Sequence, residues 1–297
     1  MEADDFHGSY KIKRCNTCSS HSVNPAPNEE ALNDYYNNGK CNLLLDDLLK
    51  ARYKKTADFI LDDRIKIVLD LIGGINKGDV NLLEIGCSSG TFLAKLKHFI
   101  AEKFPDKRIL LAGIDIDANA IQSCVDKELE LTVANAETFA RSAVGKYDII
   151  VHFELIEHLI DPFSFMTNLH KLLTTNGCML FTTPNAGGLE MMASGYNDFR
   201  LLAHSIFPPM HLNAFSVANM THFAIRCGFQ VMEISTPGKL DIDMLTVCAD
   251  DIDNDGLKRL TTLDEETKGL IQYLVTFLHG SSHMRCILKK KYEVSHG

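Results

Sequence analysis

The feature that most constrains the fold is an alternation of short apolar runs with amphipathic segments along most of the chain. Six apolar runs have the length of buried strands, at residues 81–85, 109–114, 129–134, 147–153, 178–183 and 229–235. Segments with apolar residues three and four apart predict helices between them, at residues 91–103, 118–126, 162–173 and 217–227. Alternating strands and helices of this kind predict an α/β fold, with a parallel sheet covered by helices on both faces.

Two further segments extend this pattern at its ends. Residues 43–72 have helical spacing and precede the first strand, and an apolar run at residues 284–288 predicts a last strand. The connection before that last strand is too long for a hairpin turn, so it must leave the sheet and return. Its helical part predicts a buried apolar face formed by Leu270, Ile271, Leu274, Phe277 and Leu278.

The chain therefore divides into two parts. Residues 1–60 are expected to form an N-terminal head and helical cap, and residues 61–297 the α/β domain. Within that domain we expect a lid over residues 187–215, because long connections in compact domains usually carry function, and a helical insertion over residues 241–280. The lid and the insertion are expected to pack side by side.

The turn after the first strand carries the first candidate site. It reads Glu84-Ile85-Gly86-Cys87-Ser88-Ser89-Gly90 and is followed at once by a predicted helix. Glycine lets the backbone approach a ligand closely, and a helix N-terminus favours an anionic group. Taken alone, the same turn could serve only tight packing.

Polar residues follow the next two strands at the corresponding point. Asp115 ends the second strand, where a carboxylate can accept both ribose hydroxyls of an adenosine. Asp117 is better suited to cap the following helix. Asn135 and Ala136 come just after the third strand, where a polar side chain can meet an adenine edge, although a loop asparagine is an equally good interpretation.

The order of these motifs resembles that of the class I S-adenosylmethionine (SAM)-dependent methyltransferases over residues 82–235. The family's acid-x-Gly-x-Gly-x-Gly motif is matched with Ser88 at the middle glycine. Further matches are Tyr147-Asp148-Ile149-Ile150-Val151, Phe153-Glu154-Leu155-Ile156-Glu157-His158-Leu159, Asn176-Gly177-Cys178-Met179-Leu180 and Thr183-Pro184-Asn185. A nicotinamide-dependent dehydrogenase is the nearest rival, but its Gly-x-Gly-x-x-Gly pattern is missing.

The resemblance implies a Rossmann-like three-layer sandwich with a seven-stranded, mostly parallel sheet and an antiparallel last strand inserted between the fifth and sixth. It also implies SAM as cofactor. The residues expected to bind it are Glu84, Gly86, Ser88, Gly90, Asp115, Ile116, Asn135, Ala136 and Phe153.

The catalytic candidates lie after the fourth strand and in the lid. Glu154, Glu157 and His158 have a spacing that places them on one face of a helical turn, and His211 follows in the lid. His158 or His211 could act as a general base, or all four could bind a divalent metal, as in the small-RNA 2′-O-methyltransferases that this pattern resembles. We predict Glu154, His158 and His211 as catalytic residues without a metal. His152, in an apolar strand, is expected to be a hydrogen-bonded core histidine.

The head contains Cys15-Asn16-Thr17-Cys18, which is half of a structural zinc site. It resembles the zinc-ribbon-like start of some bacterial methyltransferases, but only His7, His21 or Cys41 could complete it. We therefore expect a metal-free remnant. Tyr35 or Tyr36 could close over the cofactor.

Composition limits the acceptor. The net charge of −9 disfavours a phosphate backbone as partner. No apolar stretch approaches the ~18–20 residues of a membrane span, and no secretory leader is visible, so a cytoplasmic enzyme without membrane contact is expected. The sequence therefore favours methyl transfer from SAM to a small molecule, with a sugar or secondary-metabolite hydroxyl as acceptor. The alternatives are a metal-dependent RNA-terminal 2′-O-methyltransferase and a non-catalytic SAM-fold binding subunit. The oligomeric state stays open.

Overall fold

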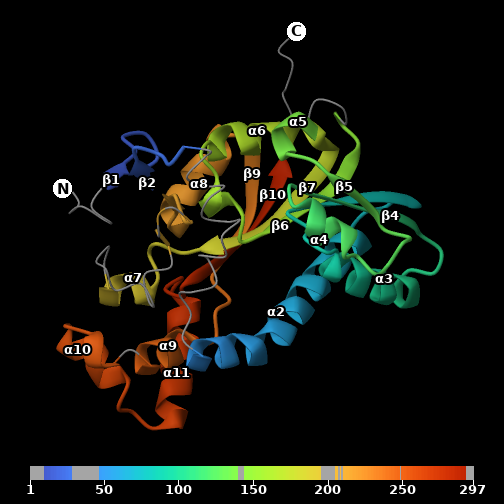
Figure 1. The fold of residues 1–297 in the computed structure, drawn as a ribbon. Helices are drawn as coiled ribbons and strands as arrows, with labels where there is room; N and C mark the ends of the chain where they lie inside the picture. Colours follow the sequence, from blue (N-terminus) through green and yellow to red (C-terminus); the bar gives the residue numbers. More distant parts are fainter. Residues whose placement is uncertain are drawn as a thin grey trace.

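The computed structural model describes residues 10–28, 47–139, 144–194, 205–206, 208, 210–247 and 249–291 (Figure 1). The predictions for Tyr35, Tyr36 and Cys41 in the head, and for the middle of the lid, lie outside these residues. No helix in the described ranges is long and apolar enough to cross a membrane.

One seven-stranded sheet forms the centre of the molecule. Its strands are β3 (Asp79–Ile85), β4 (Arg108–Asp115), β5 (Glu130–Val133), β6 (Tyr147–Phe153), β7 (Leu173–Pro184), β9 (Phe229–Ser235) and β10 (His283–Lys290). Their order across the sheet is β5-β4-β3-β6-β7-β10-β9. β10 runs antiparallel to both of its neighbours, whereas the pairs from β5 to β7 are parallel. The predicted seven-stranded sheet with an antiparallel last strand is therefore confirmed.

Helices cover both faces of this sheet, as Figure 1 shows. On one face lie α2 (Asp47–Gly73) and α3 (Thr91–Lys103), and on the other lie α6 (Pro162–Leu172) and α8 (Val217–Arg226). Neighbouring residues of β3 point to opposite faces: Leu82 belongs to the α2–α3 core and Leu83 to the α6–α8 core. α2 is continuous through residue 60, where the sequence placed the boundary of the head.

Two element boundaries differ from the prediction, and each has a local cause. α4 (Ala118–Gln122) is shorter than expected, because the hydroxyl of Ser123 donates to the carbonyl of Ala120 and closes the helix. Its cap is Asp117, as predicted. β7 begins at Leu173, before the expected residue 178, because Leu173 already pairs with Tyr147 of β6.

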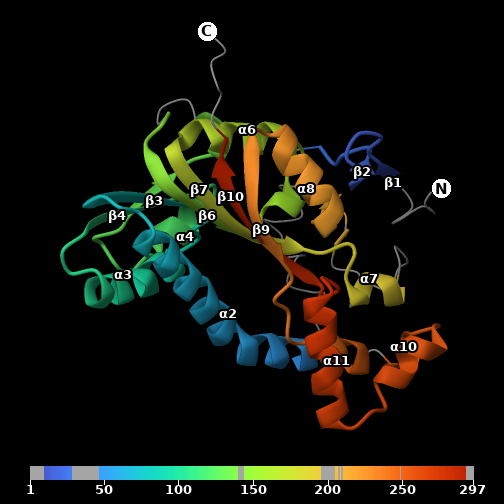
Figure 2. The same ribbon diagram turned by 180° about the vertical axis from the view of Figure 1, so that it is seen from behind.

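The insertion before β10 consists of α9 (Asp241–Val247), α10 (Asp255–Leu260) and α11 (Glu265–Phe277). It packs against α7 (Leu189–Ser194), the start of the expected lid, through a cluster centred on Leu189, Met244 and Leu245. Figure 2 shows α11 and α10 projecting from the body of the sheet.

The predicted buried face of α11 is wrong. Four of its five members, Leu270, Leu274, Phe277 and Leu278, are more than half exposed. Ile271 and Val275 face the cluster instead. Only one narrow side of α11 contacts α9. This side is too small to cover all the apolar residues that have helical spacing, and the others stay exposed.

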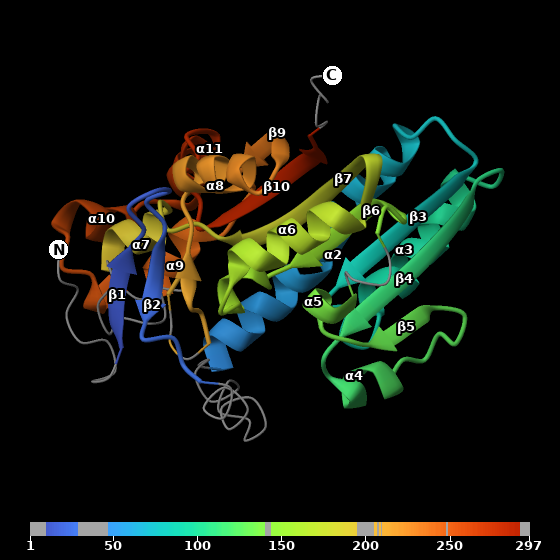
Figure 3. The same ribbon diagram turned by 90° about the horizontal axis from the view of Figure 1, so that it is seen from above.

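The head forms an unexpected contact with the end of the lid. β1 (Lys11–Arg14) and β2 (His21–Asn24) make a hairpin, and β2 pairs antiparallel with β8 (Asn213–Ala214). Figure 3 shows this small three-stranded sheet at the side of the main one. Residues nearly two hundred positions apart are thereby tied together next to His211.

Candidate active site

The turn between β3 and α3 is held in an unusual backbone conformation. Gly86, Ser88 and Gly90 have φ angles of 75°, 48° and 76°, in the left-handed region that favours glycine. A side chain on Gly90 would also approach Leu131 to 2.9 Å. Both glycines of the motif are thus favoured by conformation, and Gly90 is also required by space.

Asp115 joins this turn to the end of β4. Its carboxylate accepts hydrogen bonds from the backbone N–H of Ser88 at 2.7 Å and of Asp117 at 2.9 Å. The next residue, Ile116, is 75% exposed. A partly exposed carboxylate beside an exposed apolar side chain suits a molecule that carries hydroxyls next to a flat ring.

The third strand end completes this edge. The N–H of Ala134 donates to the carbonyl of Asp115, which places Asn135 and Ala136 directly beside it at the start of α5 (Ala136–Phe139). Phe153, at the end of β6, packs edge to face on Phe92 with ring centres 5.0 Å apart. The edge formed by β3–β6 therefore brings together the residues predicted to bind SAM.

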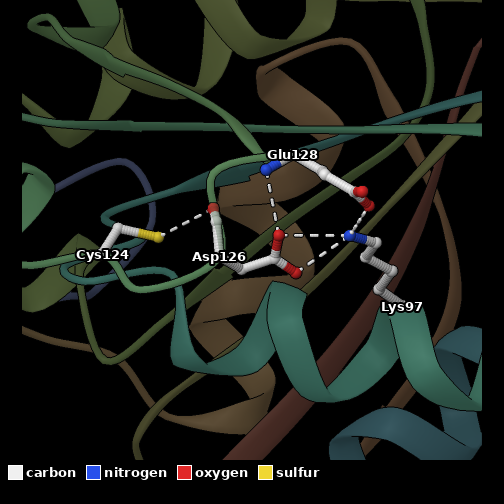
Figure 4. A network of polar contacts seen from close by, with 4 residues as sticks. All are labelled: Lys97, Cys124, Asp126 and Glu128. Carbon is white, nitrogen blue, oxygen red and sulfur yellow. Dashed lines mark hydrogen bonds and ion pairs between the residues drawn. The ribbon is translucent and has the colours of Figure 1, made fainter.

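The loop between α4 and β5 closes over this turn and is anchored to α3 (Figure 4). Lys97 forms ion pairs with Asp126 and Glu128, and the thiol of Cys124 donates to the carbonyl of Asp126. The backbone N–H of Glu128 and the ammonium group of Lys97 lower the pKa of Asp126. The anchored loop holds Cys124 at the back of Gly90.

Glu84 lies beneath the turn and is almost fully buried. Its Oε2 atom has no hydrogen-bond partner within the described part of the chain. Burial raises the pKa of this carboxyl well above its ordinary value, and the positive charge of Arg64 opposes the shift. A buried carboxylate oxygen without a partner fits a ligand with a positively charged amino acid portion.

These features fit SAM. The molecule offers an adenine ring and ribose hydroxyls to Ile116 and Asp115, and a cationic amino acid portion to Glu84 and the glycine turn. The fold, with its antiparallel strand between β7 and β9, and this edge of the sheet define a class I SAM-dependent methyltransferase.

Comparison with known proteins agrees with this class. The family model described as "Methyltransferase domain" matches residues 51–234, more than half of the chain, so the protein belongs to that family. The ubiquinone biosynthesis O-methyltransferase of Pseudomonas aeruginosa is 25% identical over 154 residues, which cover 46% of this chain and 61% of the relative. Its mitochondrial counterpart from Bos taurus is 25% identical over 136 residues, covering 43% and 35%. The chain spans about half the length of the curated relatives it matches.

A solved structure extends the likeness to the whole chain. The 1,6-didemethyltoxoflavin-N1-methyltransferase of Burkholderia thailandensis, solved with bound 1,6-didemethyltoxoflavin and S-adenosylhomocysteine, superposes with a TM-score of 0.52 over 98% of this chain and 100% of the other. At 9% identity this likeness shows the fold alone.

Glu154 lies outside the cluster that the two histidines form, although its backbone and its charge still act on His158. The segment after β6 is a short 3₁₀ helix (Ile156–His158) instead of an α-helical turn, and Glu154 precedes it with a φ of 49°. Its carboxylate accepts a hydrogen bond from the hydroxyl of Thr182 at 2.6 Å and lies 3.5 Å from Arg64. The prediction that Glu154, Glu157 and His158 share one face is therefore wrong.

Glu157, His158 and His211 form a cluster of their own. One potential metal-ligand atom from each lies within 4.8 Å of the others. Glu157 accepts a hydrogen bond from Thr183, and burial raises the pKa of its carboxyl well above the ordinary value. His158 Nδ1 lies 3.1 Å from the carbonyl oxygen of Met210, which leaves Nε2 towards Glu157 at 3.8 Å. Second contacts of this kind orient histidines that bind metals.

A cavity of about 540 Å³ begins where β6 ends. Of the predicted residues only Phe153 and Glu154 line it within the described chain, and His158 and His211 do not. The sequence analysis missed the other polar residues of its wall, which are Asp63, Arg64, Thr182, Glu190, Lys239, Asp241, Ser282, His283 and Arg285. Because no motif joins these positions, the one available signal was the place of His283 directly before the last predicted strand.

His152 lies in the core, as expected, but without the expected hydrogen bonds. Its ring stacks on Phe181 with ring centres 4.6 Å apart and meets Phe165 edge to face. Neither ring nitrogen has a hydrogen-bond partner within the described residues, and burial lowers its pKa to about 3. Because the lowered pKa keeps the imidazole of His152 neutral, the ring can be held in the core by packing against aromatic rings instead of by hydrogen bonds.

Cys15 and Cys18 lie at the turn of the β1–β2 hairpin. Cys18 Sγ is 3.1 Å from the hydroxyl of Ser20, and hydrogen bonds from the backbone of Cys18 and Thr17 lower the pKa of Cys15 to about 7. Over the described residues, neither thiol belongs to a group of three potential metal ligands. The absence of zinc stays a prediction.

Proposed function

We propose that this enzyme transfers the methyl group of SAM to a hydroxyl oxygen of a small molecule bound in the cavity beside Glu154. The cavity is the observation that carries the proposal. It is bounded by α2, by the ends of β6, β7 and β10, and by α9, and it shares Phe153 with the edge proposed to bind SAM. An acceptor there would face the reacting end of the cofactor.

The walls of the cavity indicate a largely apolar acceptor of moderate size. Ile60, Ile67, Met244 and Met284 supply apolar surface, and polar groups gather around Glu154. This division is typical of small-molecule sites, where a few polar groups orient a mostly apolar ligand. The volume is too small for a folded nucleic acid, although a single nucleotide would fit.

The chain's own residues would align the acceptor and exclude water. Bound SAM supplies an electrophilic methyl group on a sulfonium. The guanidinium of Arg64 lies 4.2 Å over the ring of Phe153 and donates to Thr182 at 3.1 Å, so this corner is rigid. Fixed positioning of two reactants supplies much of the rate of a direct displacement.

Methyl-labelled SAM tests the proposal with matched acceptors. The enzyme is incubated with 4-ethylphenol, 4-ethylcyclohexanol, 4-ethylaniline and a short RNA duplex, and products are identified by mass spectrometry. We expect label on a hydroxyl oxygen of a small molecule. Label on the aniline nitrogen alone, or on the RNA, would contradict the proposal.

A second candidate is metal-dependent transfer to a terminal RNA 2′-hydroxyl, favoured by the Glu157–His158–His211 cluster. Carboxylate and imidazole ligands suit Mn²⁺, Co²⁺ or Zn²⁺. Calorimetry with Mn²⁺ and Co²⁺ on the wild type and on Glu157→Gln tests the site, with His222→Asn as an exposed control. Methylation of RNA that EDTA abolishes would favour this candidate over the first.

A further inference from the structure

Within the described wall of the cavity there is one histidine, His283, and it lies beside Glu154. His283 is the first residue of β10 and pairs with Pro184 of β7. Its Nε2 atom is 3.5 Å from Glu154 Oε2, and its side chain is 40% exposed. A titratable ring thus joins the cavity to solvent at the point where β6 ends.

The orientation of Glu154 is fixed by contacts other than His283. Its Oε1 atom accepts the hydroxyl of Thr182 and faces Arg64, and its backbone N–H donates to the carbonyl of Thr182 at 3.0 Å. The backbone of Glu154 lies in the left-handed region, with a φ of 49°. Because Oε1 is engaged in this way, Oε2 is the oxygen that meets the imidazole.

This pair lies between the cofactor edge and the acceptor cavity. Ile85 of β3 is in parallel register with His152 of β6. Gly86 and Phe153 are therefore neighbours, and Glu154 is the next residue. A hydroxyl bound in the cavity and directed at the cofactor's methyl group would lie within reach of His283.

We infer that His283, oriented by Glu154, removes the proton of the acceptor hydroxyl. This inference rests on the proposed function and identifies the general base of that reaction. A proton on Nε2 faces Glu154, so Nδ1 carries the lone pair. The hydroxyl proton passes to Nδ1 while the oxygen bonds to the methyl carbon. The carbon–sulfur bond breaks, and its electron pair stays on sulfur. The products are a methyl ether, S-adenosylhomocysteine and an imidazolium, which faces Glu154 and releases its proton to water.

The strength of this base favours one acceptor class. A neutral imidazole can act as general base toward either kind of hydroxyl, but proton transfer is less uphill from an aromatic hydroxyl, whose pKa is about 10, like that of tyrosine, than from an aliphatic alcohol. The acceptor is therefore a phenol with a neutral, apolar body. The other charged groups lining this cavity are Asp63, Arg64, Glu190, Lys239, Asp241 and Arg285.

Steady-state kinetics on His283→Asn, with 4-ethylphenol as the probe, tests the inference. We expect kcat to fall about 100-fold, the usual effect of a positioned base, while the acceptor KM and the Kd for SAM change less than about threefold. The remaining rate should increase with pH as the phenol ionises, and the more acidic 4-nitrophenol should be affected less. Glu154→Gln, which keeps the shape of the side chain and removes its charge, should lower kcat about tenfold while the acceptor KM and the Kd for SAM again change less than about threefold. His279→Asn, an exposed histidine before β10, is the matched control and should behave as wild type.

Each other outcome overturns the inference. An unchanged kcat in His283→Asn would show that His283 is not the general base. An increase in KM without a change in kcat would show that His283 only binds the acceptor. Equal rates with 4-ethylcyclohexanol and 4-ethylphenol would contradict the assignment of the acceptor as a phenol. A wild-type enzyme that is inactive on 4-ethylphenol would contradict it as well. If another small-molecule hydroxyl is methylated while 4-ethylphenol is not, the proposed function stands and this inference fails.

Discussion

The two halves of the sheet's carboxyl edge are built in different ways. The cofactor half, at the ends of β3, β4 and β5, consists of short consecutive runs whose backbone groups make the key contacts, such as Ser88 N–H to Asp115. The half that we propose for the acceptor, called the acceptor half, is the cavity. Its polar corner joins Arg64, Glu154, Thr182 and His283 from four separate segments. The groups proposed to bind the cofactor belong to short runs of consecutive residues. The groups proposed to bind the acceptor are side chains from remote segments, which come together only when the chain folds.

Each half contains a buried carboxyl group, Glu84 in the cofactor half and Glu190 in the acceptor half. Burial raises the pKa of the Glu190 carboxyl from 4.5 to about 8, and Asp241 adds to the shift. A raised folded-state pKa means that stability is greatest at acid pH and is lost as the pH rises from about 4.5 towards 8. Glu190→Gln should therefore gain on the order of 4 kcal/mol relative to wild type between pH 4 and pH 8.

Urea unfolding at pH 4, 6 and 8 measures this difference. Glu84→Gln is the companion variant in the cofactor half, because burial also raises the pKa of Glu84 and its contribution has the same sign. A wild-type minus Glu190→Gln difference that is equal at all three pH values would mean that Glu190 does not titrate in this range.

The cofactor half should respond most strongly to Asp115→Ala. We expect SAM binding to weaken by about 1.5–3 kcal/mol, since a hydrogen bond to a charged group is worth that much. Calorimetry with SAM measures the effect. Asp117→Ala is the matched control: it removes the cap of α4 and costs about 1 kcal/mol of stability, but should leave SAM affinity unchanged. Equal affinities for Asp115→Ala and wild type would remove Asp115 from the site.

A variant outside the cavity tests whether acceptor binding can be changed without changing SAM binding. Gln272 of α11 donates to Asp241 at 2.6 Å and to the carbonyl of Gly238 at 3.1 Å, and accepts from the N–H of Ile242. Gln272→Ala should loosen this wall, cost about 1–3 kcal/mol of stability and increase the acceptor KM, while the Kd for SAM stays constant. The exposed neighbour variant Tyr273→Ala should change neither. A parallel loss of SAM affinity would show that the halves are not independent.

The smallest effect is expected in the head, away from both halves. Cys15, with its pKa lowered to about 7, should react with iodoacetamide at neutral pH before Cys178 and Cys227, whose pKa values burial raises to about 11 and about 12. Peptide mass mapping over time gives the order. Labelling of Cys15 should leave SAM affinity unchanged, and elemental analysis should find no zinc. One zinc per chain, or faster labelling of a buried cysteine, would contradict these expectations.

The sequence by itself determined the sheet and the place of the glycine turn and the strand-end acids along one edge of it. Strand and helix periodicity, the glycine turn and the acids at strand ends are signals within a few consecutive residues, and parallel strands must bring their carboxyl ends to one edge. The Asp117 cap followed from the same local information, whereas the antiparallel last strand was expected from the resemblance to the class I methyltransferases.

Only the tertiary structure decided the acceptor half. The i, i+4 spacing of Glu154 and His158 predicted one helical face, but the backbone of Glu154 is left-handed. No local sequence pattern predicts such a conformation for a glutamate. The meeting of Arg64, Glu154 and His283 depends on how α2 crosses the sheet and where β10 enters it, and a one-dimensional pattern carries no information about distances between remote segments. The exposed face of α11 has the same cause, because periodicity shows which residues share a face, and packing alone decides whether that face is covered.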